Sequence, residues 1–552
     1  MVSSHLSGDS VLEKRLLYSI GQGQLKAGLT FLNQDSIIAH KDERGTITAT
    51  RNRCKHQGRQ FANTNGCVLT CPGHDWKLDF STMTYVVPTG GLKQEQLLVE
   101  ETPEGRVSFY ELLRAPWESD PSNDEVLDAE EFTLRFYAHA CVEVRCGSRS
   151  LFTDPWLVGP AFTRGWWLVH QPPIDWLDRL ASADAVYISH NHSDHLNTHT
   201  LRHLAARNPD VPIFVPAFEN DYCLPLLEKI GLRNVTITNF GKWVPLGEAA
   251  HFMILRDGTG RNDSGILIDY KGHRILNTVD CQNLNNGPLP KVEVLLTSFA
   301  GGASGYPVCW EGYSEQRRRE LMRNKRQAIL LNVLNIVTKA RPEIYVPFAG
   351  YFTEAHPADK EIKSLNVKNT PQEVCDFIRT HFSEIDTWIP QPGAILDIGL
   401  KRSVDSSLVP ENAHAEEVIY DFEPYLAEIR QSRAFVPLQT QEGLRKYFAW
   451  AGFRGNLVLH VIETEENFQG SVREFYIDFQ DLSFPAKRPL REHMYLRMRC
   501  RSDVFRFVLQ YGLPWEEITI GFQARLFREP DIYEFEFSNH FQNKLPHTPP
   551  PW

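Results

Sequence analysis

Residues 187–195 read YISHNHSDH, a stretch that joins an apolar run typical of a strand to a cluster of metal-binding side chains. The potential ligands are His190, His192, Asp194 and His195. Imidazole and carboxylate groups bind iron and zinc, so this residue set indicates a metal centre. A loop after a strand can aim His190 and His192 at one ion, and Asp194 and His195 at a second ion. The spacing therefore predicts a centre for one or two metal ions.

The sequence on both sides of this loop has the pattern of an α/β domain. Apolar runs such as AVYISH, PIFVPA, GILIDY and RILNTV alternate with helical segments, the longest of which is expected over residues 314–340. The H-x-H-x-D-H spacing after a strand is the signature of the metallo-β-lactamase fold. We therefore expect a metallo-β-lactamase-like domain with αββα layers over residues 130–400.

The same fold offers further ligands at the ends of later strands. Asp280, in ILNTVDC, stands where a carboxylate bridges both metals, and His356 is the candidate for the last ligand of the second metal. Asp257 follows the strand HFMILR, where many hydrolytic members have a His, and an extra carboxylate favours iron over zinc. Asp257 as a turn residue and His356 as a surface residue remain the alternatives. His139 and Asp154 are expected to support the site by orienting the imidazoles.

A second motif lies near the start of the chain, where residues 53–58 read RCKHQG and residues 70–76 read TCPGHDW. A Cys-x-His pair followed by a Cys-x2-His pair is the ligand order of a Rieske [2Fe–2S] centre. The thiolates would hold one iron and the neutral imidazoles the other, which raises the reduction potential. The ligands would be Cys54 and Cys71 on the first iron, and His56 and His74 on the second. A zinc knuckle is the alternative.

Length and composition indicate a globular chain of about three domains. The chain has 552 residues, of which 42% are hydrophobic and 23% charged. Short β-like runs predict an all-β Rieske domain over residues 1–115. The aromatic-rich end of the chain, with helical and strand-like pieces mixed, predicts an α+β C-terminal region over residues 401–552. We therefore expect a multidomain fold in which the α/β domain lies between the other two in the sequence.

Charge and cysteine content exclude several classes of protein. A net charge of −11 argues against a nucleic-acid-binding protein, and ten cysteines are too few for a disulfide framework in a chain of this length. No signal peptide and no apolar run long enough to span a membrane are recognised. We therefore expect a cytoplasmic protein without a membrane span.

Taken together, the strings CKHQG, ISHNHSDHL, KGHRILNTVDC, FAGGASGYP and DLSFPAKRP resemble the cytidine monophosphate-N-acetylneuraminic acid hydroxylase family nearly end to end. The resemblance implies a Rieske-dependent non-haem iron monooxygenase that inserts one oxygen atom from O2 into the N-acetyl methyl group of a nucleotide-activated sugar. It would convert CMP-N-acetylneuraminate to CMP-N-glycolylneuraminate. Electrons would come through the Rieske cluster from cytochrome b5, or from a ferredoxin with its reductase.

Other functions remain open at this stage. Relatives that hydroxylate UDP-N-acetylmuramate or a natural-product intermediate leave the substrate undecided, and a metal-dependent hydrolase of the same fold is the other alternative. A hydrolase has no use for a Rieske motif, and an electron carrier has no use for the loop at 190–195. Having both motifs in one chain favours an oxygenase that contains a [2Fe–2S] cluster and one or two non-haem iron ions.

Substrate recognition is the least determined part of the sequence. The glycine-rich loop at 299–307 is either a phosphate cradle or a tight turn. The basic residues between Arg317 and Arg326 would bind phosphate or carboxylate, or else form a solvated helix face. The C-terminal aromatic residues would cover the active site or only pack.

Overall fold

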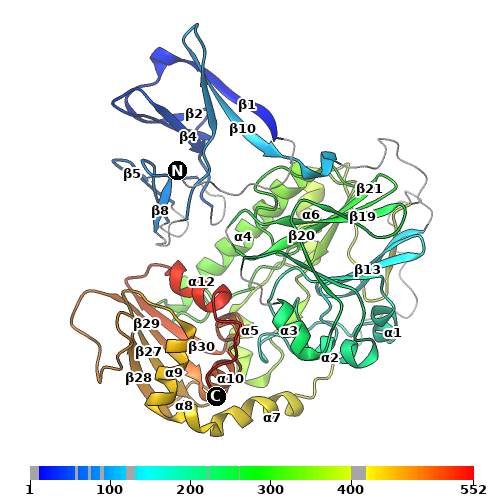
Figure 1. Ribbon diagram of the computed structural model, residues 1–552, viewed down its shortest axis with the longest axis vertical. Helices are drawn as coiled ribbons and strands as arrows, with labels where there is room; N and C mark the ends of the chain where they lie inside the picture. The colour runs from blue at the N-terminus through cyan, green and yellow to red at the C-terminus, as the bar shows by residue number, and fades with distance from the viewer. Residues whose placement is uncertain are drawn as a thin grey trace.

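The computed structural model describes residues 12–55, 60–61, 63–71, 76–87, 92–119, 131–219, 223–259, 261–399 and 418–552. His56 and His74 lie outside the described residues. Figure 1 shows an N-terminal part made of small sheets, a central α/β part, and a C-terminal part in which helices pack on a sheet. Within these ranges no helix has the length and apolar character needed to cross a membrane.

The N-terminal part is all-β, as predicted. The strands of its first sheet are β1 (Leu12–Gly21), β10 (Arg106–Arg114) and β9 (Leu98–Glu101), and those of its second are β2 (Gly28–Leu32), β3 (Ile37–Lys41) and β4 (Ile47–Arg51). The third sheet contains β5 (Asn63–Asn65), β6 (Val68–Thr70), β7 (Lys77–Asp79) and β8 (Thr84–Val87). Cys54 follows β4 and Cys71 follows β6, so both cysteines begin loops between strands.

The central part contains two seven-stranded sheets. In spatial order, the first has β17 (Val235–Thr238), β16 (Ile213–Pro216), β15 (Ala185–Tyr187), β13 (Arg149–Thr153), β12 (Cys141–Cys146), β11 (Phe132–Ala138) and β26 (Ile395–Asp397). The second has β18 (Trp243–Pro245), β19 (Ala250–Arg256), β20 (Ser264–Tyr270), β21 (His273–Asn277), β22 (Val294–Ser298), β23 (Ile344–Phe348) and β25 (Asp386–Thr387). A two-stranded ribbon pairs β14 (Trp167–Leu168) with β24 (Phe352–Thr353).

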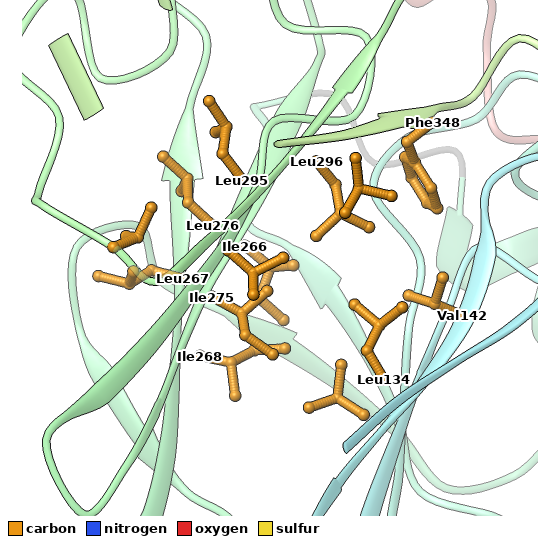
Figure 2. Close-up of a cluster of buried hydrophobic side chains, with 14 of the residues drawn as sticks. Leu134, Val142, Ile266, Leu267, Ile268, Ile275, Leu276, Leu295, Leu296 and Phe348 are labelled. Carbon is orange, nitrogen blue, oxygen red and sulfur yellow. The ribbon is translucent and has the colours of Figure 1, made fainter. Parts of the chain in front are cut away.

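The two sheets pack face to face through apolar side chains, as Figure 2 shows. Leu134 and Val142 of the first sheet face Ile266, Ile275 and Leu296 of the second, and all five are buried in one cluster. Burying one such side chain stabilises the fold by about 1.5–3 kcal/mol. Because the strands are buried on both faces, they read as continuous apolar runs, and this is why the sequence identified them.

Helices cover the outer faces and complete the αββα layers that were predicted. Those on the first sheet are α1 (Trp176–Ala181), α2 (Thr198–Arg207) and α3 (Cys223–Ile230), whose leucines pack in one cluster with Val186 and Ile213. Those on the second sheet are α4 (Glu315–Ala340) and α6 (Pro371–His381), which contact β22 and β23. The predicted long helix is α4, and Ser314 caps its first turn by accepting a hydrogen bond from the Arg317 amide.

The C-terminal part is α+β, as predicted. Its four-stranded sheet has the order β28 (Arg473–Asp478), β27 (Leu457–Thr464), β29 (Met494–Arg501) and β30 (Ala524–Glu529). Its helices are α7 (Glu423–Gln431), α8 (Val436–Gln439), α9 (Gln441–Ala451), α10 (Ser502–Tyr511), α11 (Glu516–Thr519) and α12 (Phe535–Asn543). The aromatic rings of Trp450, Phe453 and Trp515 pack in or against the core of this part rather than covering the metal centre.

This part is docked closely on the central part. The Glu311 amide donates to the Leu526 carbonyl at 2.8 Å, and fully buried Arg501 pairs with fully buried Asp359 at 2.6 Å. A Cβ atom at Gly165 would lie 2.2 Å from the Gly521 carbonyl oxygen, so the two backbones approach too closely for any side chain. The loop that contains Gly521 therefore reaches the same edge of the sandwich as the metal-binding loop.

Candidate metal centre

The candidate ligands gather at one edge of the sandwich, where several strands end. His139 follows β11, the H-x-H-x-D-H loop follows β15, and Asp280 follows β21 by three residues. Asp154 follows β13 and is fully buried. Open α/β sheets bind ligands beyond the carboxyl ends of their strands, so this position is the expected one for a site.

Asp154 holds the start of the metal-binding loop. Its Oδ1 accepts a hydrogen bond from the Ser189 amide at 2.7 Å, and its Oδ2 accepts from the Ser189 hydroxyl at 2.9 Å. The same Oδ2 lies 3.1 Å from His195 Nδ1. A carboxylate that binds the far nitrogen of an imidazole sets the orientation of its ring, which is the supporting role predicted for Asp154.

The first group of converging ligand atoms comes from His190, His192 and Asp280, all within 4.8 Å of one another. His190 Nε2 lies 2.8 Å from His192 Nδ1. The opposite nitrogen of each ring has its own partner: His190 Nδ1 lies 2.9 Å from the Ser189 hydroxyl, and His192 Nε2 lies 2.6 Å from Glu516 Oε2. This pattern is typical of metal-binding histidines, so Nε2 of His190 and Nδ1 of His192 are the nitrogens available to an ion.

The second group contains His139, Asp194 and His195. Asp194 Oδ2 lies 3.2 Å from His139 Nε2 and 3.4 Å from His195 Nε2. Asp280 Oδ2 lies 3.6 Å from the same nitrogen of His195, so this carboxylate reaches both groups, as a bridging ligand must. His139 was predicted to support the site from outside, but its ring nitrogen stands among the potential ligands.

Two buried atoms in the second group indicate that an ion belongs there. His195 Nε2 and Asp194 Oδ1 are buried and have no hydrogen-bond partner in the described part of the chain. A buried polar atom without a partner costs about 1–3 kcal/mol. Coordination of a cation would satisfy both atoms, so the residues of this group fit a metal ion. Imidazole and carboxylate ligands without thiolates suit iron.

Asp263 is a candidate ligand that sequence reasoning missed. It is buried at the start of β20, and its Oδ1 lies 3.9 Å from His190 Nε2. Burial raises its pKa to about 6, with the charges of Asp257 and Asp280 adding to the effect and those of His192 and Arg261 opposing it. Carboxylates gathered this closely repel one another, and a bound cation relieves that repulsion.

Asp257 occupies the turn between β19 and β20 and does not join either group of ligand atoms. Its Oδ2 accepts hydrogen bonds from the Thr259 amide and hydroxyl, and its Oδ1 accepts from the Asn283 amide at 2.8 Å. Both carboxylate oxygens are therefore used in holding the turn. The structure favours the turn alternative for Asp257, and Asp263 at the other end of the same hairpin faces His190 instead.

His356 also lies apart from the position predicted for it. It caps the short 3-10 helix Pro357–Asp359, and both of its ring nitrogens lie 3.0 Å from Nη1 of Arg164. Burial, followed by the charge of Arg164, lowers its pKa to about 4. A guanidinium group at this distance repels a metal cation. His356 is therefore not placed as a ligand, and His139 stands beside Asp194 and His195 instead.

The two cysteines of the Rieske motif lie next to the same hydroxyl group. Cys54 is 1% exposed and Cys71 is 3% exposed. Burial, followed by the charge of Cys54, raises the pKa of Tyr85, and the charge of Cys71 adds to the effect. The Tyr85 hydroxyl accepts from the Lys55 amide at 2.8 Å and donates to Gln94 Oε1 at 2.8 Å, which fixes its position. Both cysteines are therefore buried near one hydroxyl group whose position is fixed.

The glycine-rich loop at 299–307 has the packing of a tight turn. Gly302 has a φ of 76°, and a Cβ atom there would lie 2.9 Å from Asn366 Oδ1. A Cβ atom at Gly305 would lie 2.4 Å from the Thr519 carbonyl oxygen. These close approaches explain why glycine is required at both positions, and no bound phosphate is needed to explain it.

Half of the six basic residues at the front of α4 form ion pairs, with Arg326 pairing with Glu373. Arg317 pairs with Glu320 at 2.9 Å, and Arg319 pairs with Glu315 at 2.8 Å. Lys325 is different, because its Nζ donates to the Ser304 hydroxyl at 2.8 Å and to the Tyr306 carbonyl at 3.2 Å. Burial, followed by the charge of Arg261, lowers the pKa of Lys325 to about 8.

Fold and site together define an iron–sulfur protein of the Rieske type that carries a metal centre in a metallo-β-lactamase fold. A family profile described as "Rieske [2Fe-2S] domain" matches residues 19–91, and one described as "Beta-lactamase superfamily domain" matches residues 133–258. Over 96% of its length the chain is 42% identical to cytidine monophosphate-N-acetylneuraminic acid hydroxylase from Mus musculus, of which it covers 95%. The protein of the same name from Macaca mulatta is 43% identical over 96% of the chain and 93% of its own length. The chain therefore belongs to the cytidine monophosphate-N-acetylneuraminic acid hydroxylase family.

The similarity to solved structures covers only part of this chain. The structure of CmlA, a diiron beta-hydroxylase from Streptomyces venezuelae, is 18% identical and covers 48% of this chain and 54% of its own, with a TM-score of 0.32.

Proposed function

We propose that this protein hydroxylates the N-acetyl methyl group of CMP-N-acetylneuraminate with O2, giving CMP-N-glycolylneuraminate. The observation that carries the proposal is the presence, in one chain, of a buried cysteine pair and a separate carboxylate-rich group of ligand atoms. A hydrolase would need only the second of these, and an electron carrier only the first. Identity of 42% over nearly the whole chain to hydroxylases of that name supports the choice of substrate.

The proposed ligands of the Rieske cluster are Cys54, His56, Cys71 and His74. The proposed ligands of a two-iron centre are His190, His192, Asp263 and Asp280 for one ion, and His139, Asp194, His195 and Asp280 for the other. When bound, the cluster supplies single electrons and the iron centre activates O2. The proposed units are residues 1–115 for the Rieske domain, 130–400 for the catalytic domain and 401–552 for the C-terminal region.

The side chains around the centre orient its ligands. Ser189, Asp154 and Glu516 each bind the far nitrogen of one histidine, so that His190, His195 and His192 present a defined nitrogen to the metal. Burial of the second group keeps bulk water away from the centre, which protects a C–H oxidation from side reactions.

Two cations are available for an anionic substrate. Arg261 and Lys325 form no ion pair within the described ranges. Burial lowers the pKa of His190 at the centre and that of Lys325, and the charge of Arg261 adds to both effects, so Arg261 is a neighbour of both. A CMP-activated sialic acid carries a phosphate and a carboxylate, which these side chains can bind. The proposed electron donor is cytochrome b5, or a ferredoxin with its reductase, and the proposed location is the cytoplasm.

The test is turnover in the presence of labelled O2. The purified chain, supplied with an electron donor, its reductase and CMP-N-acetylneuraminate, should form a product one oxygen atom heavier, with the atom on the acetamido methyl group. The label should come from O2 and not from water, and omission of reductant should stop the reaction. Product without the O2 label would overturn the oxygenase. Hydroxylation of UDP-N-acetylmuramate or another N-acetyl sugar nucleotide instead would overturn only the substrate.

A further inference from the structure

Helix α12 touches the N-terminal part of the chain at its first residue. The ring of Phe535 packs edge-on against Trp76, with ring centroids 6.1 Å apart and planes at 73°. Trp76 in turn packs edge-on against Tyr85 at 5.3 Å, and its carbonyl accepts a hydrogen bond from the Cys71 amide at 2.8 Å. Phe535 therefore contacts Trp76, whose backbone is hydrogen-bonded to that of Cys71, a proposed ligand of the cluster.

The other end of the same helix touches the metal centre. Gln542 Nε2 lies 3.3 Å from His192 Nε2, the nitrogen that also faces Glu516. Phe535 and Gln542 are seven residues apart, which is two helical turns, so both side chains lie on one face of the helix. At 1.5 Å per residue the two positions are about 10 Å apart along the axis.

Other contacts hold the N-terminal part in this position. Tyr533 and Phe535 both pack against the hydrophobic core that contains Cys54, Cys71 and Trp76. On the α4 side, burial and then the charge of Arg53 lower the pKa of Lys339 to about 8, so Arg53, next to Cys54, is a neighbour of that helix. Figure 1 shows the N-terminal sheets above α4 and α12.

We infer that electrons pass from the Rieske cluster to the iron centre within one chain, and that α12 sets the distance and orientation between the two. Phe535 and Gln542 act as positioning residues through Trp76 and His192. In each transfer the reduced cluster loses one electron and one ferric ion of the centre becomes ferrous, with no bond broken. The inference rests on the proposed function, because it requires both sites to hold redox-active iron.

The test measures the oxidation state of the cluster rather than the formation of product. Full-length protein loaded with iron is reduced without O2 and mixed rapidly with O2 and CMP-N-acetylneuraminate, and reoxidation of the cluster is recorded by its visible absorption and EPR signal. Phe535→Ala and Gln542→Ala should slow reoxidation several-fold, because the rate of electron transfer falls steeply as the distance between donor and acceptor grows. Sulfide content and cluster potential should be unchanged, and the rates are compared at equal iron content. Phe535→Leu, which keeps an apolar side chain, should give a smaller effect.

The matched control is Glu536→Ala, because Glu536 is an exposed residue of the same helix. It should reoxidise at the rate of the unchanged protein. Reoxidation at that rate in both Phe535→Ala and Gln542→Ala would overturn the inference. If the cluster is reoxidised through the iron centre but no sugar is hydroxylated, the proposed substrate is wrong, whereas the inferred path of electron transfer is still supported.

A mixing experiment tests whether the route stays within one chain. Cys54→Ser removes the cluster and His190→Ala disables the iron centre, so neither variant should turn over. An equimolar mixture should also be inactive if electrons move within a chain. Recovered activity, or reoxidation of the His190→Ala cluster upon addition of the Cys54→Ser protein, would establish transfer between chains and overturn the inference.

Discussion

Glu516 Oε2 lies 2.6 Å from His192 Nε2, although the two residues are 324 positions apart in the sequence. Glu516 begins α11 in the C-terminal part, and His192 belongs to the metal-binding loop of the central part. The C-terminal part therefore completes the metal centre rather than only packing against the catalytic domain.

Glu516→Ala should weaken metal binding at the centre by about 10–100-fold, the usual effect of removing an outer hydrogen-bond partner of a ligand. Iron content is measured after dialysis against a chelator, and acid-labile sulfide gives the share that belongs to the cluster. Glu516→Gln keeps an oxygen that can accept a hydrogen bond from His192, so this variant should lose less of its iron affinity. Equal affinity in all three proteins would show that Glu516 has no such role.

His139→Ala and His356→Ala distinguish the two candidates for the last ligand. His139 Nε2 lies 3.2 Å from Asp194, whereas His356 faces the Arg164 guanidinium. We expect the first variant to lose about half of the non-cluster iron, and the second to keep it all. The reverse result would restore His356 to the ligand position predicted from the sequence.

The hairpin between β19 and β20 allows a similar comparison. Asp263→Asn should reduce iron content, because Asp263 faces His190 at 3.9 Å. Asp257→Ala should keep the iron but lower the free energy of unfolding by about 1–3 kcal/mol, because two donors of Thr259 in the turn and the Asn283 amide lose their acceptor. Thermal unfolding and metal analysis separate the two effects. Loss of iron in Asp257→Ala with Asp263→Asn unaffected would contradict this assignment.

Tyr85→Phe should lower the reduction potential of the cluster without loss of iron or sulfide. The charge of Cys54 contributes to the raised pKa of Tyr85, so the hydroxyl is a neighbour of this proposed ligand, and polar groups near a ligand sulfur stabilise the reduced, more negative cluster. The potential is measured by EPR-monitored redox titration. Tyr110→Phe, at a half-buried position of β10, is the control and should leave the potential unchanged. An unaltered potential in Tyr85→Phe would mean that the hydroxyl does not influence the iron ligand.

Binding of an anionic substrate should weaken above about pH 8. The pKa of Lys325 is lowered to about 8, so its positive charge is present below that pH and is lost as the pH rises through it. The groups facing it are Ser304, the Tyr306 carbonyl and Arg261, none of which replaces the lost charge. The KM should rise above pH 8, and Lys325→Arg, which stays charged, should remove that rise. The same pH profile in both proteins would exclude Lys325 from substrate binding.

Ligands that are close in sequence were predictable because the backbone alone brings them together. In the H-x-H-x-D-H loop, all four side chains come from six residues after one strand, and any chain that forms β15 must carry them to the same edge. The apolar strands were equally clear, since strands buried on both faces leave continuous apolar runs. Cys54 and Cys71 were recognised by the same kind of local spacing.

Contacts between distant segments left no comparable signal. His139 and Asp263 reach the centre because β11 ends and β20 begins at the same edge of the sandwich, and sequence spacing does not reveal which strand ends become neighbours. Glu516 and Gln542 reach His192 only because the C-terminal part docks on the catalytic part through close backbone contacts such as Gly165 with Gly521. A lone carboxylate or amide in a helix is usually a surface residue, so its role follows from packing across parts of the chain that the local pattern cannot describe.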